Sequence, residues 1–189
     1  MDSKSGKLIL AGADMVDPNF AQTVTLIVEH TAEGALGLVL NRPSQTLVNE
    51  AWRRVEDGPC LLEGWVHQGG PCPGPLMVLH DAERQAQVDV IVGEGERIGV
   101  SFTADADDIR ELMASPPDRL RCFAGYAGWG AGQLNDELER SSWIVTDATA
   151  EAIFDSGPDL WKRLLRRINP TQAALLDNPG IVPQDPSMN

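Results

Sequence analysis

The sequence is most distinctive over Phe123-Ala-Gly-Tyr-Ala-Gly-Trp-Gly-Ala-Gly-Gln-Leu-Asn-Asp-Glu-Leu-Glu-Arg-Ser-Ser-Trp143. Four glycines and two large aromatic residues occupy eight consecutive positions of this stretch, 125–132. The apolar segment 120–123 before them predicts a buried strand. The segment 133–140 after them predicts a helix with Leu134 and Leu138 on one face. The glycine-rich positions are therefore expected to lead the chain from a strand through a turn into a helix.

Upstream of this stretch, the sequence predicts a β-hairpin followed by a helix. Residues 22–29 are rich in β-branched side chains, 31–34 have the composition of a turn, and 35–40 are apolar again. From Thr46 onward, apolar residues recur at helical spacing until the turn-forming residues 57–59. This helix is expected to pack against the sheet that contains the hairpin.

The rest of the chain continues with short strands and then with helices. Further strands are expected at 65–68, 76–80, 87–92, 98–102 and 143–145. Further helices are expected at 105–113, 158–168 and 171–176. Because strands come first in hairpins and helices cluster late, the pattern favours an α+β fold over a doubly wound sheet. A single domain over 1–180 is predicted, followed by a poorly ordered tail over 181–189.

Charge and cysteine content limit the class of protein. With 15 basic and 28 acidic residues the net charge is −13, so the surface as a whole repels phosphate backbones and anionic lipid head groups. No apolar run approaches the roughly 20 residues of a membrane span. Three cysteines form no CxxC pair and leave an odd thiol, which fits a reducing compartment better than a disulfide framework. We expect a cytoplasmic protein with no membrane partner, and the net charge disfavours nucleic acid.

The glycine-rich stretch and two shorter motifs resemble the bacterial YqgE/AlgH family. Its pattern Gly-Tyr-Ala-Gly-Trp-Gly occurs here at 125–130, Asn-Arg-Pro at 41–43 and Gly-Gly-Pro at 69–71. The resemblance covers nearly the whole chain, although Ala131 stands where the family has proline. It implies a coiled, bifurcated β-sheet, largely antiparallel or mixed, with helices packed around it. Members are mostly uncharacterised cytosolic proteins and one branch is linked to transcriptional control of alginate synthesis, so the resemblance implies no reaction.

The glycine-rich stretch has two interpretations. Its glycines could let backbone N–H groups converge on an anion at the start of the helix near Gln133. That helix, however, opens into three carboxylates, which would oppose a phosphate. The alternative, which general considerations favour, is a close approach of backbone segments with Tyr126 and Trp129 packing around it.

Two carboxylates and an arginine supply further candidate contacts. Asp14 and Asp17 could form an acid pair or a cation site, although turn capping explains them more simply. Arg42 follows Asn41 at the end of the hairpin, and its planar fork suits a carboxylate or a phosphate. Pairing of Arg42 with Asp14 or Asp17 is an equally good interpretation. The Asn-Arg-Pro motif and the motif that contains Gly70 are expected to meet in space.

No metal, cofactor or catalytic residue is predicted. Cys60, His67, Cys72 and His80 lie within 21 positions, but their spacing matches no paired Cys/His zinc pattern. His67 and His80 are instead expected at strand ends with backbone partners. The chain has no serine elbow of the Gly-x-Ser-x-Gly type and no dinucleotide fingerprint in a strand–helix context. A non-enzyme is therefore preferred.

The leading hypothesis is a regulatory, non-enzymatic protein that binds a protein partner or a small ligand through a surface that contains the family motifs. The residues of that surface are Arg42, Gly70, Tyr126, Trp129 and Gln133.

Two alternatives stay open. One is a DNA-binding regulator that uses the cations of the helix expected at 158–168, although a solvated helix face is the simpler interpretation at this net charge. Those cations are Lys162, Arg163, Arg166 and Arg167. The other is an enzyme of unknown class in which Asp14 and Asp17 serve as acid and base beside Arg42.

Overall fold

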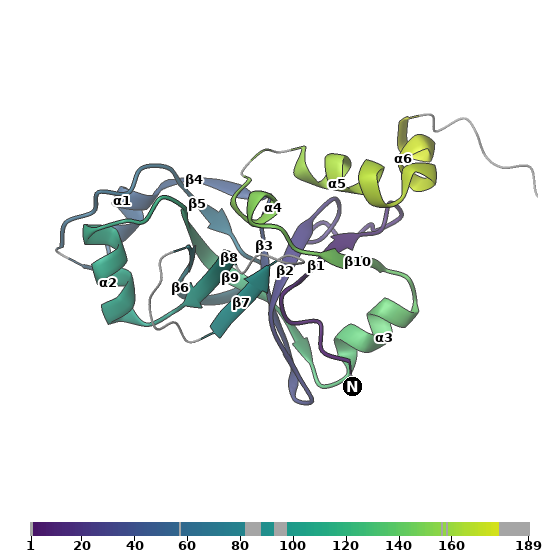
Figure 1. Ribbon diagram of the computed structural model, residues 1–189, viewed down its shortest axis with the longest axis horizontal. Helices are drawn as coiled ribbons and strands as arrows, with labels where there is room; N and C mark the ends of the chain where they lie inside the picture. The colour runs from purple at the N-terminus through teal and green to yellow at the C-terminus, as the bar shows by residue number, and fades with distance from the viewer. Residues whose placement is uncertain are drawn as a thin grey trace, which may run out of the picture.

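The computed structural model describes residues 2–56, 58–81, 88–92, 98–155, 157 and 159–177. The strands are β1 (Lys7–Ala11), β2 (Val24–Thr31), β3 (Gly34–Val39), β4 (Pro43–Leu47), β5 (Trp65–Gln68), β6 (Cys72–His80), β7 (Val88–Val92), β8 (Ile98–Thr103), β9 (Leu120–Gly130) and β10 (Trp143–Asp147). The helices are α1 (Val48–Trp52), α2 (Ala106–Ala114), α3 (Gln133–Glu139), α4 (Ala150–Phe154), α5 (Leu160–Ile168) and α6 (Pro170–Asp177). Strands and helices combine in one domain, which confirms the α+β prediction (Figure 1).

Strand β9 joins two parts of a ten-stranded sheet whose main order is β10-β1-β2-β3-β9-β6-β8-β7. Its C-terminal part pairs with β3, with Ala127 opposite Gly37 and Gly130 opposite Gly34. Its N-terminal part pairs with β6 and also runs parallel to β5, which pairs in turn with β4. The other pairings among the described strands are antiparallel. The sheet is therefore mixed, largely antiparallel and divided at β9, as the resemblance implied.

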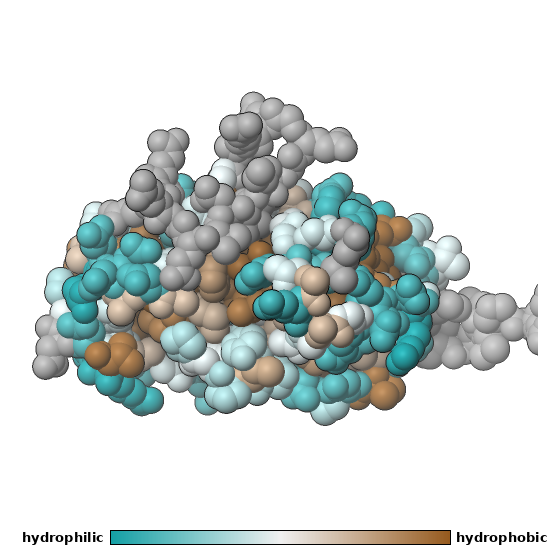
Figure 2. Space-filling view, turned by 90° about the horizontal axis from the view of Figure 1, so that it is seen from below, coloured by the Kyte–Doolittle hydropathy of each residue, from teal (hydrophilic) through white to brown (hydrophobic). Residues whose placement is uncertain are grey.

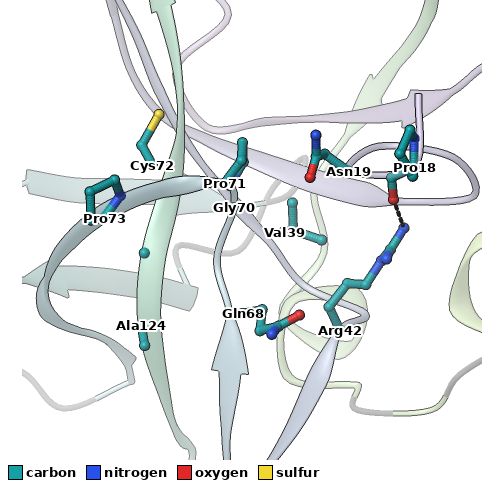
Figure 3. A pocket seen from close by; sticks show the side chains of 11 residues that line it. Pro18, Asn19, Val39, Arg42, Gln68, Gly70, Pro71, Cys72, Pro73 and Ala124 are labelled. Atoms are coloured by element: carbon teal, nitrogen blue, oxygen red, sulfur yellow. Dashed lines mark hydrogen bonds between the residues drawn. The ribbon is translucent and has the colours of Figure 1, made fainter.

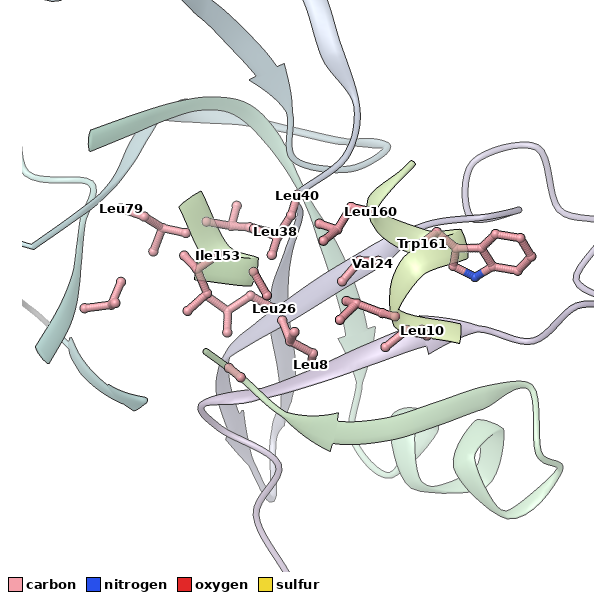
Figure 4. Packing of buried hydrophobic residues seen from close by; sticks show 14 of the residues in the cluster. Leu8, Leu10, Val24, Leu26, Leu38, Leu40, Leu79, Ile153, Leu160 and Trp161 are labelled. Carbon is pink, nitrogen blue, oxygen red and sulfur yellow. The ribbon is translucent and has the colours of Figure 1, made fainter. Parts of the chain in front are cut away.

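Both faces of β1 are buried, which explains its unbroken apolar sequence. Leu8 and Leu10 belong to a core shared with β2, β3, α4 and α5, which Figure 4 shows. Because successive side chains of a strand point to opposite faces, Ile9 lies in a different cluster, on the side of α3. Trp161 of α5 closes the first core and donates its indole N–H to the carbonyl of Ala11 at 2.8 Å. The inward face predicted for this helix is confirmed.

The glycine-rich stretch is mostly strand, which corrects the expected turn. Strand β9 continues to Gly130, and only two residues separate it from α3. The backbone turns at Gly132, the N-cap of α3, where φ is 76°. A strand with little side-chain bulk lets other segments approach closely. A Cβ added at Gly125, whose φ is +73°, would lie 2.8 Å from the carbonyl oxygens of Gly70 and Cys72.

Other elements differ from expectation in length. Residues 43–47, part of which was expected to be helical, form β4, because this segment pairs with β5. Helix α1 is correspondingly short, and α4 was not expected. The hairpin of β2 and β3 is confirmed. The predictions for Gln87, Pro158 and residues 181–189 lie outside the described residues.

The helices are distributed around the sheet rather than stacked on one face. Helices α1 and α2 lie beside the part that contains β4 to β8, whereas α3, α5 and α6 lie beside β1, β2 and β10 (Figure 1). Seen from below, hydrophilic residues cover much of both ends of the molecule and hydrophobic residues gather in the middle (Figure 2). None of the described helices is long and apolar enough to cross a membrane.

Candidate functional site

A pocket of about 400 Å³ lies between the loop after β1, the end of β3 and the connection from β5 to β6. Figure 3 shows Arg42 and Pro18 on one side of it and Cys72 and Pro73 on the other. The residues that line this pocket, named here the Arg42 pocket, are Pro18, Asn19, Val39, Arg42, Gln68, Gly70, Pro71, Cys72, Pro73, Ala124 and Gly125. Arg42 is the one charged residue among them.

Arg42 holds the loop after β1 on its own side of the pocket. Its Nη2 donates to the carbonyl oxygens of Pro18 at 3.2 Å and Ala21 at 3.0 Å. Within the described residues, no hydrogen bond uses its Nε or Nη1, and no ion pair joins it to Asp14 or Asp17. A guanidinium has five N–H donors, so the side chain keeps donors for a ligand while it holds the loop.

The loop that Arg42 contacts is built by local capping. Asp17 accepts a hydrogen bond from the backbone N–H of Asn19 at 2.8 Å, as expected for a turn. Asn41 accepts from the N–H of Val24 at 2.9 Å and donates to the carbonyl of Gln22 at 2.8 Å, which ties the loop to the hairpin. Asp14 and Asp17 are exposed and line none of the described pockets. The contact with Asn19 gives Asp17 a structural role.

The two short motifs meet in space, as expected. The N–H of Gln68 donates to the carbonyl of Arg42 at 2.8 Å, and the N–H of Val39 donates to that of Gly69 at 2.8 Å. Gly70 crosses so close to β9 that an added Cβ would lie 2.2 Å from the carbonyl carbon of Tyr126. Gly70 lines the Arg42 pocket, and β9 leaves no room for a side chain at this position.

Trp129 and Gln133 lie away from this pocket. Trp129 is only 6% exposed and packs with Phe20 and Trp143. Its indole N–H donates to Glu137 at 3.0 Å. Gln133 accepts from the N–H of Gly130 at 3.0 Å, so it braces the start of α3. The expectation that Trp129 and Arg42 share one binding surface is therefore corrected. The indole of Trp129 is enclosed by Phe20 and Trp143.

A family model described as AlgH-like matches residues 8–173. The chain belongs to the AlgH-like family. This family member is 36% identical over 195 residues to a UPF0301 protein of Streptomyces avermitilis. The aligned region covers 100% of this chain and 97% of that protein. It is 39% identical over 168 residues to a UPF0301 protein of Chlorobium limicola, with 86% of each chain covered.

Solved structures resemble this AlgH-like chain over most of its length. The solution structure of the AlgH protein from Pseudomonas aeruginosa has a TM-score of 0.71 and 30% identity, with 94% of both chains covered. A crystal structure of a protein from Corynebacterium diphtheriae has a TM-score of 0.68 with 92% of both chains covered, and at 24% identity it shows likeness of fold alone. The names of these proteins state no activity.

The four cations proposed as DNA contacts lie on the outer face of α5. Lys162, Arg163, Arg166 and Arg167 are all exposed, whereas the opposite face of the helix is buried. Arg163 pairs with Asp155, so part of its charge is used within the chain. Within the described residues, no cluster of three His, Cys, Asp or Glu side chains could hold a metal ion.

Sequence reasoning missed Arg121, which lines a pocket together with His67. Both side chains are only 5% exposed. His67 was expected to have backbone partners, and the carbonyls of Trp65 and Cys122 do act on its ring, although neither ring nitrogen makes a hydrogen bond of ordinary geometry. The available signal was a single charged residue, Arg121, within the apolar segment predicted as a buried strand. A charge in such a position is rarely tolerated without a partner or a function.

Proposed function

We propose that this AlgH-like chain is a non-enzymatic binding protein that takes a small organic anion in the Arg42 pocket. The observation that carries the proposal is the incompletely used guanidinium of Arg42 on a pocket of about 400 Å³. An arginine with unused donors is well suited to a carboxylate or phosphate. The amides of Asn19 and Gln68 line the same pocket and supply neutral hydrogen-bonding groups.

The other lining residues favour binding over reaction. Val39, Pro71 and Ala124 offer apolar contact to an organic body. Among the described residues that line the pocket there is no carboxylate and no histidine, which are the usual general acids and bases. Because Arg42 also holds the loop after β1, a ligand on its free edge would order that loop. Such ordering is a route from ligand binding to regulation of a protein partner.

A thermal-shift screen with small carboxylates and phosphate esters tests this proposal. A ligand at about 100 times its Kd stabilises by about 2.7 kcal/mol, which raises the Tm of a chain of this size by several degrees. The shift should be lost in Arg42→Ala and kept in Arg140→Ala, which removes an exposed arginine at the end of α3. The proposal fails if no anion shifts the Tm, or if Arg42→Ala responds like the wild type.

DNA binding is the second candidate, because four exposed cations share one face of α5. Contacts to phosphates would make affinity fall steeply with salt. Duplex binding measured by fluorescence anisotropy over a salt series should be abolished by joint reversal of Arg166 and Arg167 to glutamate. Unchanged binding in that variant would eliminate the α5 face as a DNA contact.

A further inference from the structure

A second pocket, of about 310 Å³, lies beside the N-terminal ends of the parallel strands β5 and β9. The Arg42 pocket lies at the other end of the same strand pair, where Gln68 and Ala124 contribute to it. This second pocket is named here the Arg121 pocket, and its lining includes Val48, Leu62, Glu63, Trp65, His67, Arg121 and Phe154.

Arg121 is a buried cation whose hydrogen bonds go to carbonyl oxygens, and its guanidinium also lies 5.4 Å from the centroid of the Phe123 ring. Its Nη1 donates to Ile153 at 2.6 Å and Asp155 at 3.2 Å, and its Nη2 donates to Leu40. These three bonds leave two of the five N–H donors, one on Nε and one on Nη2. The Nε atom is buried and has no hydrogen-bond partner. Two donors on neighbouring nitrogens match the spacing of the two oxygens of a carboxylate.

His67 lies in the wall of the same pocket as a neutral imidazole. Burial, together with the nearby charge of Arg121, lowers the pKa of His67 to about 4, although the carbonyls of Cys122 and Trp65 favour the protonated ring. A neutral imidazole has one donor and one acceptor nitrogen. Neither nitrogen has a partner of ordinary hydrogen-bond geometry.

Within the described residues, Arg121 forms no ion pair that would compensate its charge directly. The carboxylate of Asp155 pairs with Arg163 and acts on Arg121 only through space, while its backbone carbonyl accepts a hydrogen bond from Arg121. Buried charges are normally paired, because the loss of hydration is otherwise not offset. An anion on the free edge of the guanidinium would supply the missing charge and occupy the unused donors.

The remaining wall selects the kind of anion. Val48, Leu62 and Phe154 give it an apolar side, and Trp65, which also lines it, is 51% exposed. Glu63 is also exposed at this site and would repel a second negative charge. We propose that the Arg121 pocket binds a small monocarboxylate with an apolar body, whose carboxylate contacts Arg121 and His67.

Benzoate is the probe for this site, with benzyl alcohol as its uncharged analogue and inorganic phosphate as a dianion. Titration of the full chain at pH 7, followed by ¹H–¹⁵N NMR, should shift the Nε–H signal of Arg121 and the indole signal of Trp65. Each comparison probe should bind at least about tenfold more weakly than benzoate, because one lacks the charge and the other meets Glu63. Equal or tighter binding of phosphate would overturn the assignment to a monocarboxylate.

Variants separate this site from a structural role of Arg121. Arg121→Lys should weaken the binding of benzoate by about tenfold or more. Arg119→Lys, which changes an exposed arginine two positions earlier in the chain, should leave it unchanged. Because Arg121 also links three carbonyls, Leu62→Trp provides a variant that fills the pocket and leaves those bonds in place. Retained binding in Leu62→Trp, or no shift of either signal at about 10 mM benzoate, overturns the proposal. Arg42→Ala should leave benzoate binding unchanged; loss of binding there would assign the signal to the Arg42 pocket instead.

Discussion

Replacement of Glu137 by alanine should destabilise the fold through two tryptophans that it holds. The carboxylate accepts the indole N–H of Trp129 at 3.0 Å and of Trp143 at 2.8 Å. The two tryptophans are 6% and 4% exposed, so their indole donors have little access to water once the carboxylate is removed. Glu137 therefore connects α3 with both the end of β9 and the start of β10.

The magnitude follows from the two donors. A buried donor left without a partner costs about 1–3 kcal/mol, which gives about 2–6 kcal/mol for the pair. Because Glu137 is itself partly exposed, water can replace some of the lost bonds, and we expect about 2–4 kcal/mol. For a chain of this size that corresponds to a Tm lower by roughly 4–16 °C.

Urea denaturation followed by tryptophan fluorescence measures this loss, with Glu139→Ala as the matched control. Glu139 lies on the same helix and is exposed, so both variants share the same change in helix propensity. The free energy of unfolding should fall in Glu137→Ala and stay within about 0.5 kcal/mol of wild type in the control. Equal effects in the two variants would refute the idea that Glu137 holds the tryptophan pair.

Three further outcomes are expected. Gly125→Ala should lower the free energy of unfolding, measured by urea denaturation, by about 2–4 kcal/mol, because φ is +73° and a Cβ would meet two carbonyl oxygens. Gly99→Ala adds a Cβ in open space and should lower it far less. The pKa of His67 is lowered from 6.5 to about 4, so the unfolded chain takes up a proton first as pH falls. The free energy of unfolding should keep its full value above about pH 6.5 and fall by up to about 3 kcal/mol towards pH 4. This fall should be absent in a His67→Gln variant. Burial raises the pKa of Cys122 to about 12, so a thiol reagent at pH 8 should modify the two partly exposed cysteines first, and early labelling of Cys122 would contradict this.

Much of the fold could be predicted because its signals are local. The hairpin of β2 and β3 follows from two apolar runs around a turn, and the buried face of α5 follows from apolar spacing. The strand at 43–47 could not be predicted in this way. It exists because β5, about 20 residues further along the chain, provides its hydrogen-bond partner.

The candidate sites were predictable only in part. Resemblance to family motifs drew attention to Arg42 and Gly70, and both line the Arg42 pocket. The same reasoning selected Trp129, an aromatic residue beside glycines, which the structure encloses with Phe20 and Trp143. Arg121 was overlooked, because its spacing matches no motif and its burial depends on segments that end at Leu40 and Asp155.

The sequence by itself determined most of the strands and helices, with β4 and α4 as exceptions, and it marked positions where glycine is needed. Apolar periodicity and turn composition act over a few residues, so they can be read along the chain. Only the tertiary structure decided that the glycine-rich stretch continues β9, that its tryptophan is enclosed, and that Arg121 is buried with donors unused. These features depend on which distant segments pair across the sheet, and strand pairing joins residues that local sequence does not connect.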